Sequence, residues 1–251
     1  MRGTIGTPKP EAENFREMSF LDHLGELRKV LVQSCVVFTV LMVVCWFFSG
    51  RILDVLVRPL PVKSLYFNSP MEAFMVRVNI SLAVGFMLAF PFILFRVWAF
   101  VSPGLFSHER KKIFPFVVAS SALFYAGVLF CYIVLIPIAL KMLLSFGTAR
   151  VNPLISVNSY FGFVARMCFA FGVVFQLPVA VLILSILGIV TPRWLVRQWR
   201  NGVVVILVAS AVLTPTQDAL SMMAMAIPVM VLYAASILIA FVIVRKKTPD
   251  E

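Results

Sequence analysis

The chain has 251 residues, of which 61% are hydrophobic and only 13% are charged, and its formal net charge at pH 7 is +11. Its mean hydropathy is +1.00, and apolar runs recur at lengths near the ~20 residues that span a bilayer as a helix, which excludes an ordinary soluble domain. Contact with anionic lipid explains the excess of Lys and Arg, and no basic patch interleaved with aromatic residues indicates a nucleic-acid partner.

Residues 1–18 are predicted to form a cytoplasmic tail, because they lack the apolar stretch and cleavage site of a signal peptide. Residues 19–29 are predicted to form an amphipathic helix at the membrane interface, which then turns into the first span. On a helical wheel the leucines of this segment share one arc, while Glu26 and Lys29 fall on the other. Glu26 is therefore expected to face water at the cytoplasmic rim.

Six apolar segments follow, and each is predicted to be a membrane-spanning helix, since a helix satisfies its own backbone polar groups in lipid. We therefore expect an all-α integral membrane protein, with a single six-helix domain over residues 19–244 and a cytoplasmic tail at 245–251. The predicted spans are Val30–Phe48, Val76–Trp98, Ile113–Pro137, Phe161–Leu187, Val203–Leu213 and Ala219–Val244.

The positions of the basic residues predict the orientation of the spans. Lys and Arg concentrate in the N-terminal tail, in the loops after spans two and four, and in the C-terminal tail. Both termini are therefore expected to be cytoplasmic. The segment Ser49–Met75 is expected to be a long outer loop that contains a short helix.

The fifth predicted span is too short for an unperturbed membrane. Its 11 residues, Val203–Leu213, would extend about 16 Å as a helix, against a hydrocarbon core of ~30 Å. Helices five and six are therefore expected to be short, and the bundle is expected to be concave.

Two acidic residues are the strongest candidates for a binding site. Glu26 and Glu109 are predicted to lie on the cytoplasmic face, Glu109 in the loop after span two. Two carboxylates near a membrane surface can each accept paired N–H bonds from arginine, and such bidentate contacts discriminate arginine from lysine. The alternatives are that Glu26 is a solvated charge offset by Lys29, and that Glu109 only balances its basic neighbours.

Catalytic and metal sites are not predicted. The cysteines fall in apolar spans without metal-ligand spacing, and they are expected to be packing residues. Motifs for phosphate binding, serine hydrolysis and zinc proteolysis are missing from the sequence, so neither an enzyme nor a cofactor is expected. The four cysteines are Cys35, Cys45, Cys131 and Cys168.

Several segments, in order along the chain, resemble TatC, the polytopic subunit of the twin-arginine protein translocase. The resemblance covers nearly all of the chain from Ser19 to Val244. The segments that carry it are His23–Lys29, Val97–Leu105, His108–Lys111, Phe124–Gly127, Phe171–Val179 and Leu213–Asp218.

The resemblance implies a receptor for signal peptides with paired arginines, carried by folded cargo proteins. It implies that Glu26 and Glu109 bind these arginines at the cytoplasmic surface, with Arg28 and Phe100 contributing to the same site. It also implies single-span TatA-like and TatB-like partners, self-association in a larger complex, use of the proton-motive force and a bacterial inner membrane location. Pro59 and Asp218 match further positions of functional weight in the family, although Asp218 could equally cap the sixth span.

One position departs from the family pattern. The site in span four that often carries Glu is Gln176 here, and an amide cannot titrate. Gln176 is expected to contact the signal peptide or a partner helix from a concave inner face, and the alternative is an interhelical hydrogen bond within the chain. A second hypothesis for the whole protein is a proton-coupled small-solute transporter or channel, but that class should carry titratable residues at mid-membrane.

Arg166 also lies inside span four, and it matches none of the family motifs. An arginine at this depth is costly unless its side chain extends to the interface or finds a partner. Its side chain is expected to extend toward the outer leaflet.

Overall fold

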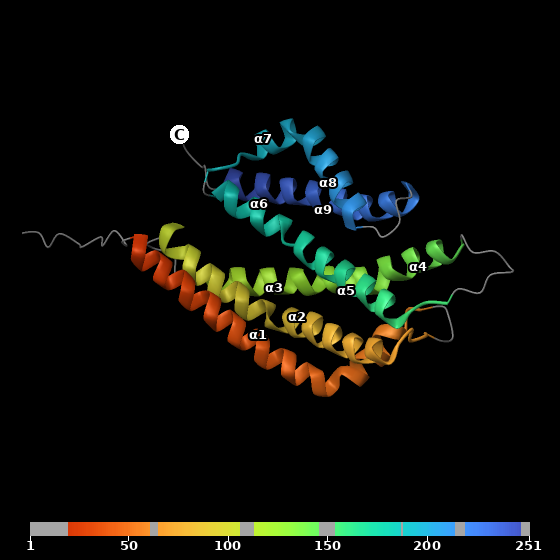
Figure 1. Cartoon of the computed structure of the whole chain (residues 1–251). Coiled ribbons are helices and arrows are strands. Elements are labelled where there is room, and N and C mark those ends of the chain that lie inside the picture. Colours follow the sequence, from red (N-terminus) through yellow and green to blue (C-terminus); the bar gives the residue numbers. More distant parts are fainter. Residues whose placement is uncertain are drawn as a thin grey trace, which may run out of the picture.

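The computed structural model describes residues 20–60, 65–105, 113–145, 154–186, 188–213 and 219–246. The regular structure in these ranges is helical, and Figure 1 shows the helices lying roughly side by side in two groups. In chain order they are α1 (Phe20–Val57), α2 (Pro70–Leu105), α3 (Ile113–Phe130), the π-helix η2 (Cys131–Leu135), α4 (Ile136–Ser145), α5 (Val157–Val174), α6 (Leu177–Ile186), α7 (Pro192–Arg197), α8 (Trp199–Leu213) and α9 (Ala219–Lys246).

The all-helical membrane fold is confirmed, with five long apolar helical stretches and one shorter apolar helix in the described ranges. The shorter one is α8, whose 15 residues extend ~22 Å, less than a ~30 Å hydrocarbon core. The expectation of a short sixth helix is wrong, because α9 has 28 residues. The long stretches are Leu24–Val57, Pro70–Phe100, Phe114–Ser145, Val157–Ser185 and Met222–Val242.

The first helix differs from its prediction at both ends. α1 is one continuous helix of 38 residues, so the expected turn between an interfacial helix at 19–29 and the first span is wrong. No proline interrupts this stretch to force a turn. At its other end α1 continues past Phe48 to Val57, and α2 begins at Pro70, so both ends of the expected outer loop Ser49–Met75 are helical.

The helices pack around two separate clusters of buried apolar side chains. The larger cluster is built mainly from α2, η2, α4 and α5, and α1 lies against it along α2. The smaller cluster joins α6, α7 and α9 through Val181, Leu195 and Ile237. In Figure 1, α6 to α9 form the group on one side and α1 to α5 form the other.

The chain passes between the two groups at Phe175 and Gln176, where the predicted fourth span is broken. Pro178 has no N–H for the carbonyl four residues earlier, so the helix cannot continue unchanged across this point. Instead, the Gln176 N–H donates to the Val173 carbonyl at 2.9 Å, a tighter turn, and a new helix begins at Leu177. The break directs the second half of this span toward α9.

We call the end of the bundle that carries the starts of α2 and α5 the Glu72 end. The opposite end, where α1 begins and α2 finishes, is the Glu26 end (Figure 1). At the Glu72 end, Ser69, Pro70 and Glu72 form a helix-starting pattern in which the Ser69 hydroxyl accepts the Glu72 N–H at 3.2 Å. The Glu72 Oε2 atom accepts the Asn68 N–H at 2.5 Å.

The same carboxylate also holds the start of α5. Glu72 Oε1 accepts a hydrogen bond from the Ser156 hydroxyl and one from the Asn158 N–H at 3.1 Å. Ser156 is the N-cap of α5, and a short parallel bridge pairs it with Tyr66. A negative charge at this position favours the helix start, because the first N–H groups of a helix have no partners within it. Glu72 therefore ties α2, α5 and the preceding loop together.

Two tyrosines complete the contacts at the Glu72 end. The last carbonyls of α1 have no partner within the helix. The Tyr132 hydroxyl donates to the Val55 carbonyl at 2.5 Å, and the Tyr160 hydroxyl donates to the Leu56 carbonyl at 2.7 Å. These bonds fix the end of α1 to η2 and α5.

A glycine allows α3 and α5 to approach closely. A Cβ atom at Gly172 would lie 2.5 Å from a ring carbon of Phe124. The Phe124 ring is fully buried and stacks on Phe90, with centroids 3.6 Å apart, so it has little room to move. Gly50 is also helical, but a Cβ there would meet nothing within 4 Å.

Gly172→Ala is therefore expected to destabilise the protein by about 1 to 3 kcal/mol, as overpacking of a filled core does. Gly50→Ala should be neutral or stabilising by up to ~1 kcal/mol, because alanine favours a helix and meets no neighbour. Thermal unfolding in detergent, followed by the reactivity of the buried Cys45, Cys131 and Cys168 thiols in a Cys35→Ser background, measures both. Equal unfolding temperatures for the two variants would contradict this packing.

Glu72→Ala is expected to lower the unfolding temperature more than Ser69→Ala does. The serine caps α2 alone, and its loss should cost about 1 kcal/mol, whereas the carboxylate accepts bonds at the starts of both α2 and α5. The same thiol assay ranks the two variants. If Ser69→Ala is equally or more damaging, Glu72 does not connect the helices as described.

Candidate functional site

The structure places Glu26 in the second turn of α1, where it is half-buried. The leucines near Glu26 on α1 are exposed, Leu24 by 45%, Leu27 by 46% and Leu31 by 64%. The expectation that Glu26 faces water does not match this half-buried position. Exposed leucines are expected on the outer side of a helix that lies in lipid, whereas a carboxylate within a span turns toward the bundle where it can.

Glu26 makes no hydrogen bond or ion pair with another described residue, and this includes Lys29. The alternative of a Glu26–Lys29 surface pair thus has no support in the described part of the chain. Arg28 and Lys29 are exposed, and they line a depression of about 460 Å³ on α1 together with Gly25, Val32 and Gln33.

The end of α2 contributes aromatic and basic side chains to the Glu26 end. Phe100 is half-buried, two residues after Trp98. The Trp98 indole packs against Phe116 of α3 with ring centroids 6.4 Å apart, and the Arg96 guanidinium lies 5.4 Å from the centre of the Phe92 ring. Among the described side chains, this end therefore combines the Glu26 carboxylate with aromatic surfaces.

Several buried polar atoms in the described structure have no hydrogen-bond partner. Those toward this end include the Ser34 hydroxyl, two turns after Glu26 along α1, the Arg96 Nε and the Trp98 indole nitrogen, and among the others are the Ser120 and Ser121 hydroxyls of α3. Buried polar groups are normally paired, and an unpaired group costs free energy. The atoms toward this end are candidates for bonds to a group that binds here.

The remaining predicted residues divide into two groups. Glu109 and Asp218 lie outside the described residues, so the pairing of Glu26 with Glu109 stays a prediction. Pro59 is half-buried just beyond the end of α1, at the Glu72 end. Since α1 extends ~57 Å, Pro59 cannot belong to the same site as Glu26.

Gln176 lies at the break between α5 and α6. It is half-buried, and its Nε2 atom donates to the Ser120 carbonyl of α3 at 3.0 Å. The alternative to contact with a signal peptide or a partner helix was an interhelical hydrogen bond, and the structure contains such a bond. The bond ties the redirected chain back to the first group of helices.

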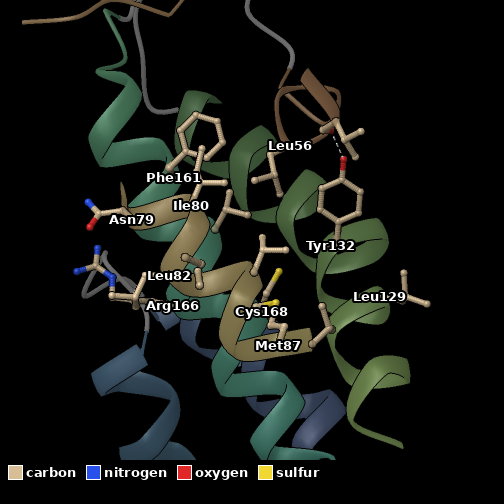
Figure 2. A pocket seen from close by; sticks show the side chains of 17 residues that line it. Leu56, Asn79, Ile80, Leu82, Met87, Leu129, Tyr132, Phe161, Arg166 and Cys168 are labelled. Atoms are coloured by element: carbon tan, nitrogen blue, oxygen red, sulfur yellow. Dashed lines mark hydrogen bonds between the residues drawn. The ribbon is translucent and has the colours of Figure 1, made fainter. Parts of the chain in front are cut away.

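An apolar cavity of about 440 Å³ opens near the Glu72 end, between α1, α2, η2 and α5 (Figure 2). Its lining is mostly aliphatic and aromatic, and Asn79 and Arg166 are its main polar members. Gln176 does not line it. The sequence predicted a concave inner face lined by Gln176, and the lining of this cavity does not match that expectation. The role of Glu72 was not predicted, although the pattern Ser69-x-x-Glu72 is a known signal for a helix start.

Metal binding has no support in the described ranges, where no group of three or more His, Cys, Asp or Glu side chains is placed to hold an ion. Cys45, Cys131 and Cys168 are buried among apolar side chains, as expected of packing residues, while Cys35 is exposed on α1.

Comparison with known proteins identifies the family. The family model for the Sec-independent protein translocase protein (TatC) matches residues 22–228. The TatC protein of Aquifex aeolicus is 35% identical over 236 residues, covering 92% of this chain and 98% of the relative. The TatC protein of Carboxydothermus hydrogenoformans is 34% identical over 238 residues, covering 94% and 98%, respectively.

A solved structure and a chloroplast protein are also similar to this chain. A crystal structure described as the twin arginine translocase receptor TatC matches with a TM-score of 0.78 and 34% identity, covering 88% of this chain and 98% of that one. The chloroplastic TatC of Oryza sativa subsp. japonica is 39% identical over 220 residues, covering 87% of this chain and 61% of the relative. The chain therefore belongs to the TatC family, and it is a membrane subunit of a twin-arginine, Sec-independent protein translocase.

Proposed function

We propose that this chain is the receptor subunit of its translocase, and that it binds twin-arginine signal peptides at the Glu26 end. The observation that carries the proposal is the half-buried Glu26, which has no partner among the described residues. A carboxylate held in partly apolar surroundings forms a stronger bond with an arginine than one in water does, because less solvent screens the charges.

The proposed site accounts for recognition of a pair of arginines rather than one. Glu26 binds one guanidinium and Glu109 binds the other. Phe100 and the neighbouring aromatic rings offer surfaces on which a planar guanidinium can stack. Arg28, exposed on a different side of α1, does not share this surface, and its contribution is indirect or directed to the flanking part of the peptide.

The wider role follows from membership of the family. Both termini are proposed to be cytoplasmic, so the Glu26 end faces the compartment in which folded cargo arrives, in a bacterial inner membrane. TatA-like and TatB-like single-span subunits and further copies of this chain complete the complex, with Pro59, Gln176 and Asp218 as partner-contact or structural positions. The role is transport without catalysis, and the proton-motive force supplies the energy.

Glu26→Gln is expected to weaken binding of a twin-arginine signal peptide by about 10- to 100-fold, since a hydrogen bond to a charged group contributes ~1.5 to 3 kcal/mol. The measurement is titration of the purified protein in lipid nanodiscs with a fluorescent signal peptide, together with export of a twin-arginine reporter in cells.

Asp54→Asn provides the matched control, because Asp54 is an exposed carboxylate on the same helix near its opposite end. This variant should bind the peptide as the unmodified protein does. Normal affinity and export for Glu26→Gln would refute the receptor site proposed here.

A further inference from the structure

The cavity near the Glu72 end is open to the surrounding membrane. Three of its lining side chains, Val55 of α1, Leu82 of α2 and Leu129 of α3, are exposed by 44%, 47% and 55%. Its volume of about 440 Å³ lies within the ~300 to 1,000 Å³ that ligand pockets occupy. Apolar cavities do not hold water well, so a cavity of this kind beside a bilayer favours hydrocarbon.

The polar groups of the cavity lie together on one side of it. In Figure 2 the tips of Asn79 from α2 and Arg166 from α5 point away from the apolar side chains, toward the same side. Asn79 is held near the start of α5, since its Nδ2 atom lies 3.4 Å from Oδ1 of Asn158. The Arg166 guanidinium and the Asn79 amide thus lie at the opening of the apolar cavity.

Arg166 extends toward the Glu72 end. It lies nine residues after the start of α5, about 13 Å along the helix. Side chains on a helix lean toward its N-terminus, and Nη2 of Arg166 lies 3.9 Å from the position that a Cβ of Gly162 would occupy, one turn closer to that end. The guanidinium therefore rises toward the membrane surface on that side, as expected from the sequence.

Arg166 is exposed and forms no ion pair with another described residue. An arginine within a membrane span needs an anion or water to offset its cost. For an exposed arginine near one end of a membrane-spanning helix, the phosphate of a phospholipid is an anion within reach, and the acyl chains of that lipid match the apolar lining of the cavity.

We propose that this cavity binds an anionic phospholipid from the leaflet at the Glu72 end. One acyl chain enters the cavity, and the lipid phosphate is bound by the Arg166 guanidinium with the Asn79 amide as a second donor. The lipid fills the space between the ends of α1, α2 and α5. This site is separate from the Glu26 end and does not depend on the function proposed there.

The test is native mass spectrometry of the whole protein released from nanodiscs that contain equal amounts of phosphatidylglycerol and phosphatidylcholine. The unmodified protein should retain phosphatidylglycerol in preference. Arg166→Gln should reduce that preference about fivefold, the effect expected for one arginine near a membrane surface.

Two further variants separate this site from general effects of charge and folding. Arg77→Gln removes an exposed arginine near the same end of α2 that does not line the cavity, and it should leave the preference unchanged. Ala83→Phe fills the cavity and should reduce retention of both lipids. Equal retention of the two lipids by the unmodified protein, or the same loss in Arg77→Gln as in Arg166→Gln, would overturn the proposal.

Discussion

The carboxylate of Glu72 is the contact on which the arrangement of the other helices depends. It accepts hydrogen bonds from Asn68, Ser156 and Asn158, so that α2 and α5 begin at the same place and run in the same direction. In a membrane, backbone groups at a helix start cannot rely on water alone, and a shared acceptor satisfies several of them at once. At the end of α1, the hydroxyls of Tyr132 and Tyr160 donate hydrogen bonds to backbone carbonyls of the last turn.

This arrangement makes the two ends of the bundle unlike each other. At the Glu72 end, hydrogen bonds within the chain join the starts of α2 and α5 and the end of α1. Because α2 and α5 run in the same direction, Asn79 and Arg166 lie on the same side of the apolar cavity (Figure 2). At the Glu26 end, the described residues leave one half-buried carboxylate and several buried polar atoms without partners. Under the function proposed above, the end that binds the peptide is separate from the end whose hydrogen bonds hold the helices together.

The lengths of the apolar runs predicted the apolar helices, of which the described ranges contain five long ones and a shorter one, because the length of an apolar run is set mainly by the thickness of the bilayer. The sequence could not predict that Glu26 is half-buried, since a helical wheel shows which side chains share a side of the helix and not what covers that side. The break at Gln176 has a visible cause in Pro178, which leaves the carbonyl four residues earlier without a donor and is expected to kink a membrane helix. Glu72 was overlooked because its partners, Ser156 and Asn158, are more than 80 residues away along the chain. Glu26 was singled out because acidic side chains are few in so basic a chain, and its role in binding stays a prediction.

The central claim is that the Glu26 end recognises paired arginines. It is tested most directly by placing a photocrosslinking amino acid at position 26 in native membranes and supplying a signal peptide with either two arginines or two lysines. The account predicts strong crosslinks to the arginine peptide and weak ones to the lysine peptide, with no such difference from a probe at position 54. Crosslinks that are missing, or equal for the two peptides, would contradict it.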